Sequence, residues 1–308
     1  MSQKPVLLPV RDLYLAVDLL VKRAAMATAE LLSPSIGDKP FMQWLWKRLL
    51  DERMLPRQIV LRPLSHTGVQ VLCNPYTFTH RTVYWCGHLY ERPLERYLRR
   101  TLRRGDTLID VGMNLGHVTS LGASLVGEAG HVYAFEVNGP LALQVEDVLH
   151  RQGMLQVKVF PVGLGEQAGE ARLQMSSHEA GTNTLREEIV NGSGDDHMLV
   201  EIAVGDELIE KLPLRGRVVL KVDVEGYERQ VLRGLRQTIS GHVRGAVVEV
   251  TPQWIGGANG VSELFEIMRG CGLSAHELTL SGSAGAVLTP AAIVEQTNVL
   301  FQRGNEEH

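Results

Sequence analysis

The segment 108–119 constrains the fold of this chain more than any other part of the sequence. It reads Leu-Ile-Asp-Val-Gly-Met-Asn-Leu-Gly-His-Val-Thr, so a short apolar run passes into a turn with two glycines before a helical pattern begins. A strand that ends in such a turn presents backbone N–H groups and a helix N-terminus at the carboxyl edge of a sheet. Because glycine lacks a Cβ, a ligand can approach the main chain closely. Such turns occur both at nucleotide-type sites and in purely structural junctions, so the next strand decides between them.

The strand that follows favours a ligand site. Residues 131–136 read His-Val-Tyr-Ala-Phe-Glu, so this strand ends in an acid one strand–helix unit after the turn. A carboxylate in that place accepts hydrogen bonds from both hydroxyls of an adenosine ribose. A dinucleotide site would have glycine where this turn has Asn114, and Asp110 offers an acid to a cationic group. S-adenosyl-L-methionine (SAM), which carries a sulfonium and an ammonium, therefore fits better than NAD.

Composition and charge indicate an ordinary globular protein. The chain has 308 residues, 44% hydrophobic and 21% charged, so one large α/β domain with an N-terminal extension fits its length. A formal net charge of −4 gives no basic footprint for nucleic acid. The cysteines at 73, 86 and 271 have no metal-ligand spacing, which predicts free thiols, a cytoplasmic location and no metal site. Charged residues interrupt the apolar stretch 13–32, which predicts an amphipathic helix rather than a signal sequence or membrane span.

From about residue 105 the chain alternates strands with helices, which predicts an α/β fold. The pattern indicates a doubly wound, mostly parallel, seven-stranded sheet with right-handed crossovers. Five core strands are expected, and then two that add antiparallel to the edge: 107–111, 131–136, 156–162, 218–222 and 245–249, then 274–280 and 297–303. The intervening helices are expected near 116–126, 140–151, 228–239 and 262–270.

The region before this alternation is expected to be a separate extension. Residues 1–83 read as mainly helical with a short hairpin in which 58–62 pairs with 69–72, and the main domain is expected to span 84–308.

An insertion at about 163–217 separates the third and fourth core strands and holds a long polar span. Such spans within compact domains are commonly functional or disordered, and this one emerges at the ligand edge of the sheet. Asn183 and Arg186 are favoured for positioning a polar acceptor, whereas His178 reads as either a base or an ordinary surface histidine. The predicted substrate-binding residues are His178, Thr182, Asn183 and Arg186.

A second motif places ionisable residues at the end of a buried strand. Residues 218–228 read Val-Val-Leu-Lys-Val-Asp-Val-Glu-Gly-Tyr-Glu, and an extended chain would place Lys221, Asp223 and Glu225 on one side. Capping of the next helix explains Glu228 but not a lysine at the end of an apolar strand. The motif is therefore predicted to contribute to the chemistry of the site.

Together these motifs resemble the FkbM family of SAM-dependent methyltransferases. The similar segments lie within residues 84–303 and are, in chain order, 87–91, 109–116, 134–136, 220–234, 249 and 298–301. Two positions depart from the family pattern, because Met113 replaces an alanine and Val137 replaces a proline. Met113 is tolerable if it points into the core, and Val137 leaves the ribose-binding acid in place.

The resemblance implies a class I methyltransferase with a Rossmann-like fold, transferring a methyl group from SAM to a hydroxyl of a small molecule such as a sugar or natural-product intermediate. Asp223 is the first candidate for accepting the hydroxyl proton or holding the SAM ammonium, Glu225 is the second, and Glu249 suits either role. Lys221 would lower the pKa of these carboxylates or hold the substrate. The residues expected to bind SAM are Tyr90, Glu91, Asp110, Gly112, Met113, Asn114, Gly116, His117, Thr119, Glu136, Val137 and Asp223.

Other functions stay open at this point. One is N-methylation of a peptide or of a small-molecule amide or amine, and another is a non-catalytic SAM-binding subunit. An NAD-dependent oxidoreductase is disfavoured by Asn114 and by the absence of a Tyr-x-x-x-Lys pair in a catalytic helix. The sequence leaves open whether the acceptor is free or attached to a carrier or peptide, and whether the chain is a monomer or a homo-oligomer.

Overall fold

The computed structural model describes residues 58–174 and 197–304, apart from 66, 75–79, 81–82, 85–86, 88 and 90. The predicted helical extension before residue 58 and the polar span of the insertion, 175–196, lie outside these residues. Among the helices that the model describes, none is long and apolar enough to cross a membrane.

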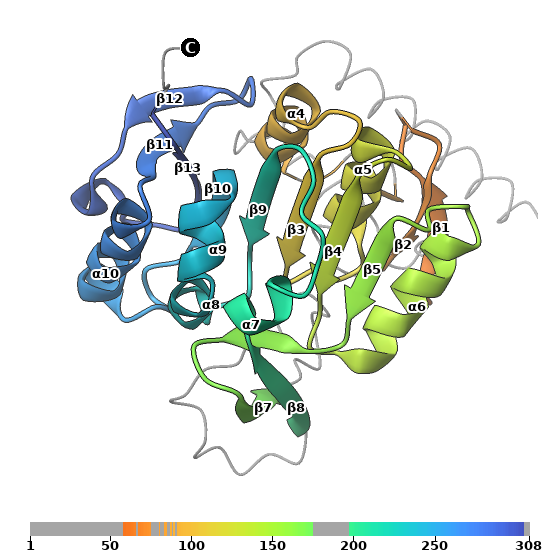
Figure 1. Ribbon diagram of the computed structural model, residues 1–308, viewed down its shortest axis with the longest axis horizontal. Helices are drawn as coiled ribbons and strands as arrows, with labels where there is room; N and C mark the ends of the chain where they lie inside the picture. The colour runs from red at the N-terminus through yellow and green to blue at the C-terminus, as the bar shows by residue number, and fades with distance from the viewer. Residues whose placement is uncertain are drawn as a thin grey trace, which may run out of the picture.

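A large mixed sheet with helices on both faces forms the centre of the molecule (Figure 1). Its strand order is β12-β11-β13-β10-β9-β3-β4-β5, and the five strands from β10 to β5 are parallel. The fold class is therefore the predicted α/β class. The strands are β3 (Thr107–Val111), β4 (His131–Phe135), β5 (Val157–Phe160), β9 (Val218–Val222), β10 (Val243–Val250), β11 (Ser274–Leu278), β12 (Ala284–Val287) and β13 (Thr297–Gln302).

The predicted number of strands, seven, is wrong by one. The extra strand, β12, forms within the glycine- and serine-rich segment that joins β11 to β13. It pairs antiparallel with β11 through His276–Val287 and Leu278–Ala284, and so covers backbone groups that an edge strand would expose.

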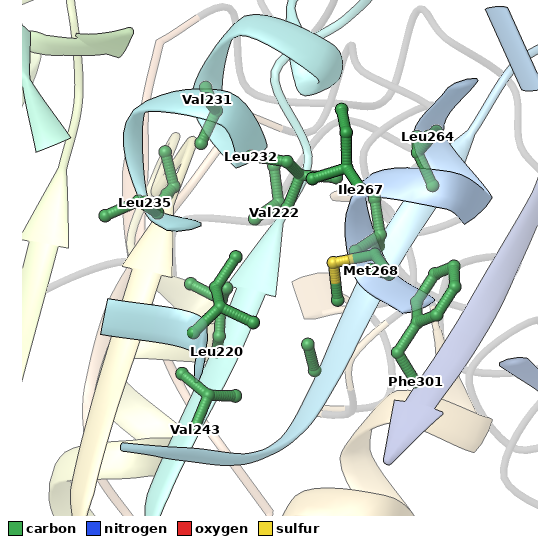
Figure 2. Close-up of a cluster of buried hydrophobic side chains, with 14 of the residues drawn as sticks. Leu220, Val222, Val231, Leu232, Leu235, Val243, Leu264, Ile267, Met268 and Phe301 are labelled. Carbon is green, nitrogen blue, oxygen red and sulfur yellow. The ribbon is translucent and has the colours of Figure 1, made fainter. Parts of the chain in front are cut away.

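Two hydrophobic clusters occupy the two faces of the sheet, because successive side chains of a strand point in opposite directions. Ile109, Leu220 and Val248 belong to the cluster on one face, and Leu108, Val219 and Val247 to the other. The first face is covered by α8 (Glu228–Gly234), α9 (Arg236–Gly241) and α10 (Gly257–Gly270), and the second by α4 (Arg92–Thr101), α5 (His117–Val126) and α6 (Gly139–His150). Figure 2 shows the first cluster, in which Leu220, Val222, Val231, Leu232, Leu264 and Met268 lie between the strands and these helices.

The helix predicted over 228–239 is divided into α8 and α9 at Leu235. Gly234 lies so close to the backbone of Gly165 that a Cβ on it would be 2.0 Å from the Gly165 carbonyl oxygen. The break therefore accompanies a tight backbone contact that the helical periodicity alone does not reveal.

The insertion contributes a small sheet beyond the edge at which the parallel strands end (Figure 1). Its strands are β6 (Gly163–Gly165), β7 (Gly169–Gln174) and β8 (His197–Val204), in the order β6-β8-β7, and the short helix α7 (Gly205–Ile209) follows. Val200 and Ile202 of β8 are buried against Val137 and Tyr227, so this sheet has a small core of its own.

The predicted hairpin is present as β1 (Val60–Pro63) and β2 (Gln70–Cys73), which pair antiparallel. Gln152, just after α6, holds it in place, because its amide oxygen accepts from the Gln70 N–H at 2.7 Å and its amide nitrogen donates to the Gln70 carbonyl at 2.9 Å. The hairpin thereby belongs to the same packed face as α5 and α6.

Candidate active site

The glycine turn after β3 lies directly against the turn after β9. Gly112 has φ +80°, and a Cβ on it would be 1.7 Å from the carbonyl oxygen of Asp223. Its N–H donates to the Phe135 carbonyl at 3.0 Å, which ties the turn to β4 as well. Met113 is 3% exposed and points into the core, as the sequence requires. The missing Cβ at Gly112 is therefore what allows the turns after β3 and β9 to lie in contact.

Glu136 joins this turn to the one after β4. One carboxylate oxygen accepts from the Asn114 N–H at 2.9 Å, and the other accepts from the Asn138 N–H at 2.9 Å. Burial raises the pKa of Glu136, and these two donors oppose the shift. Asn114 has φ +52°, and its buried side-chain oxygen has no hydrogen-bond partner among the described residues. The carboxylate is thus fixed in place, and an unsatisfied acceptor lies on the same turn.

Lys221 connects the two motifs from a buried position. Only 5% of the residue is exposed, and its Nζ donates to the Gly112 carbonyl at 2.7 Å. The same Nζ lies 3.4 Å from a carboxylate oxygen of Asp110 and 3.4 Å from one of Asp223. Burial alone would lower the pKa of Lys221, but the surrounding carboxylates raise it, led by Asp223 and Asp110. The lysine therefore stays charged, and it neutralises carboxylates at the ends of two neighbouring strands.

Asp110 is wholly buried, and its second oxygen accepts from the Thr119 hydroxyl at 2.6 Å. Burial raises the pKa of Asp110, whereas Lys221 and Thr119 lower it. In this arrangement Thr119 supports Asp110 from the first turn of α5.

Three carboxylates converge where β9 and β10 end. Oxygens of Asp223, Glu225 and Glu249 all lie within 4.8 Å of one another, and each residue is half-buried. Burial and the nearby Asp223 raise the pKa of Glu249 to about 10. Gln296 donates to a carboxylate oxygen of Glu249 at 2.6 Å. Carboxylates at such spacing also occur without a metal ion, so the metal-free site stays a prediction.

Glu225 is close to Asp223 for a reason that differs from the predicted one. The strand β9 ends at Val222, and Glu225 has φ +53°, so the chain turns instead of continuing extended. Glu228 stabilises this turn, because one of its carboxylate oxygens accepts from the N–H groups of Val224 at 3.2 Å and Gly226 at 3.0 Å.

Sequence reasoning missed the contribution of β13 to the site. Asn298 donates to a carboxylate oxygen of Glu91, and Gln296 holds Glu249. Burial raises the pKa of Glu91, and the Asp223 carboxylate raises it further. Because β13 is antiparallel to β10, its first residues lie where β10 ends. The signal in the sequence was therefore polar residues at the start of a strand rather than after its end.

Other predicted residues have different surroundings. The His117 ring faces the hairpin, where Nε2 donates to the Leu72 carbonyl at 2.6 Å. Any contact of His117 with the cofactor is therefore left to its backbone N–H, at the start of α5. Burial lowers the pKa of His117 to about 4, so this ring is neutral. Val137 packs on the small sheet of the insertion. Tyr90, His178, Thr182, Asn183 and Arg186 lie outside the described residues, and their roles stay predictions.

Comparison with known proteins identifies the family. Residues 110–274, more than half of the chain, match the family model described as the methyltransferase FkbM domain. The chain belongs to the FkbM methyltransferase family. The match covers the glycine turn, Glu136 and the motif after β9, which are the segments brought together at the edge of the sheet.

This FkbM family member is similar to the hexuronic acid methyltransferase AglP of Haloferax volcanii. The two are 28% identical over 163 residues, which are 52% of this chain and 62% of that relative. Among solved structures, a methyltransferase FkbM from Methylobacillus flagellatus KT is 16% identical with a TM-score of 0.42, covering 69% of this chain and 49% of that one. A protein described as a putative rRNA-methylase from Clostridium thermocellum is 13% identical with a TM-score of 0.42, covering 69% of this chain and 94% of that one.

The predicted cofactor, SAM, is confirmed by family membership. The residues of the site fit it. The unsatisfied oxygen of Asn114 lies on the glycine turn, and the fixed carboxylate of Glu136 retains lone pairs for ribose hydroxyls. An excess of carboxylates around Lys221 suits a cationic ligand.

Proposed function

We propose that this FkbM family member is a SAM-dependent O-methyltransferase that acts on a hydroxyl of a small polar molecule, of the sugar or natural-product type. The observation that carries the proposal is the meeting, at one edge of the sheet, of the Gly112 turn, the Glu136 carboxylate and the carboxylates around Lys221. The relative AglP, described as a hexuronic acid methyltransferase, supports a sugar-type acceptor.

The residues have separate roles in this mechanism. SAM supplies a methyl group on a sulfonium, and attack from the side opposite the sulfur makes positioning of the two reactants the main source of acceleration. Glu136 holds the ribose, while Asp110 and Lys221 fix the two turns relative to each other. Asp223 is the first candidate to accept the hydroxyl proton, since its carboxylate is held by Lys221 and is half-buried. Glu225 and Glu249 are the alternative acceptors.

Methyl transfer from radiolabelled SAM to a panel of acceptors tests this function. The panel contains neutral sugars, hexuronic acids, hydroxylated aromatic compounds, amines and short peptides. Label on a hydroxyl oxygen supports the proposal, whereas label on nitrogen would favour the N-methyltransferase alternative. Tight SAM binding without transfer to any class would favour the non-catalytic subunit.

Glu136→Ala is expected to weaken SAM binding by about 1.5–3 kcal/mol, the scale for losing hydrogen bonds to a charged group. The measurement is isothermal titration calorimetry on folded protein. Glu170→Ala, an exposed acid on β7, is the matched control and should bind SAM like the wild type. Unchanged affinity in folded Glu136→Ala would remove the ribose assignment.

Asp223→Asn is expected to lower kcat by about 10²–10⁴, because the amide cannot accept the hydroxyl proton. The variant keeps the shape of the side chain, so SAM affinity measured by calorimetry separates a chemical loss from a binding loss. A pH–rate profile of the residual activity adds a second readout. Wild-type turnover in this variant would exclude Asp223 as the proton acceptor.

A further inference from the structure

The charges around the site do not balance. In the part of the chain that the structure describes, Lys221 is surrounded by carboxylates. Glu136 interacts with it electrostatically, and Glu228 interacts with Asp223. Five further acids come from four separate segments. Asp110 and Asp223 form ion pairs with Lys221, and Glu91 and Glu249 interact with it electrostatically. Glu225 interacts with Glu249. The five acids are Glu91 before α4, Asp110 on β3, Asp223 and Glu225 after β9, and Glu249 on β10.

Full ionisation of these acids is unfavourable without a cation in addition to Lys221, because like charges close together repel. Carboxylate oxygens of Asp223, Glu225 and Glu249 lie within 4.8 Å of one another, and closely spaced carboxylates in a partly buried site share protons. Burial raises the pKa of both Glu91 and Glu249. The amides of Asn298 and Gln296 each donate to one oxygen of these two acids, which leaves the second oxygen of each to carry a proton.

We propose that the carboxylate cluster around Lys221 holds a proton, shared by Glu91 and Glu249, in the cofactor-free protein and releases it when SAM binds. This inference rests on the proposed function. The cluster adjoins the cofactor turn directly, because Lys221 donates to the Gly112 carbonyl and Asp223 lies against Gly112. SAM brings a sulfonium and an ammonium, whereas its product S-adenosylhomocysteine has lost the sulfonium. The cluster therefore distinguishes cofactor from product by charge.

Release of a proton on SAM binding also leaves the cluster able to accept a proton in the transfer step. In the transfer step the acceptor oxygen forms a bond to the methyl carbon, sulfur keeps the electron pair of the broken C–S bond, and the O–H bond gives up its proton. This hydroxyl proton passes to the carboxylate cluster, which SAM binding had left ionised. S-adenosylhomocysteine then leaves a site that has regained its starting charge.

The sign of the pH dependence follows from this proton release. In the pH range where the free cluster is protonated, SAM binding releases one proton. The affinity for SAM then rises by up to about tenfold for each unit of pH. The affinity for SAM should therefore rise with pH more steeply than the affinity for S-adenosylhomocysteine.

Calorimetric titrations of the full chain with SAM and with S-adenosylhomocysteine test the inference. They are run at one pH in phosphate, HEPES and Tris, with EDTA present, so that the dependence of the observed heat on buffer ionisation gives the protons released. We expect about one proton for SAM and fewer for S-adenosylhomocysteine. Glu249→Gln and Glu91→Gln should each reduce the number of protons released when SAM binds, whereas the exposed control Glu207→Gln on α7 should not.

The outcomes separate the two proposals. SAM binding with buffer-independent heats, or equal proton release for SAM and S-adenosylhomocysteine, would overturn the proton linkage and leave the methyltransferase assignment intact. Absence of SAM binding in every buffer would overturn both. The wild-type titrations decide the matter even if a variant fails to fold, which circular dichroism checks.

Discussion

Gly112→Ala is expected to abolish detectable SAM binding and to lower the free energy of unfolding by about 3 kcal/mol or more, the combined scale of a forbidden backbone angle and an overpacked contact. The new Cβ would lie 1.7 Å from the Asp223 carbonyl oxygen, which is backbone and cannot rotate aside. The turns after β3 and β9 would have to separate, and they hold the cofactor and the proton acceptor in the proposed mechanism. Urea denaturation and calorimetry measure the two effects.

The control for this substitution is Gly153→Ala. Gly153 has φ +82°, nearly the same as Gly112, but a Cβ there would meet nothing within 4 Å. The free energy of unfolding of Gly153→Ala should therefore fall only by the cost of the backbone angle, about 1–2 kcal/mol, and the variant should bind SAM normally. Similar losses of stability and of SAM binding in the two variants would mean that the contact between the turns contributes to neither.

Lys221→Met is expected to destabilise the fold by about 3–5 kcal/mol, the scale for removing one partner of a buried ion pair. Asp110 is wholly buried and would be left beside an apolar side chain, while the Gly112 carbonyl would lose its donor. SAM binding should weaken as well, because the two turns are no longer tied together. Thermal and urea denaturation measure the stability.

Two controls define the cause of that loss. Lys211→Met removes an exposed lysine after α7 and should change stability by less than about 0.5 kcal/mol. The double variant Lys221→Met with Asp110→Asn should recover part of the loss, because the uncompensated buried charge is gone. If the double variant is as unstable as the sum of the single variants, the charge pairing is not what Lys221 provides.

The short-range patterns predicted the elements that build the site. The strand at 107–111 and the strand at 218–222 have the bounds that their mainly apolar runs indicate, because a strand buried on both faces is mostly apolar. Glycines at positive φ and acids at strand ends are also local features, so the turn at Gly112 and the acid Glu136 were recognisable from the chain alone.

Contacts between residues far apart in the chain could not be predicted from these local patterns. Nothing near Glu249 or Glu91 in the sequence indicates that Gln296 and Asn298 would hold their carboxylates, since β13 reaches the site only by lying antiparallel beside β10. The His117 ring likewise faces the hairpin because β2 packs on α5.

The sequence by itself determined the chain order of the strands other than β12, the glycine turn and which carboxylates end the strands, because these depend on periodicity and on backbone angles within a few residues. Only the tertiary structure decided that Gly112 touches Asp223, that Lys221 is paired with Asp110 across neighbouring strands, and that, among the described residues, several carboxylates gather around Lys221. Those facts depend on strand register and burial, which arise when segments more than a hundred residues apart pack together, and burial is what makes their charges interact strongly.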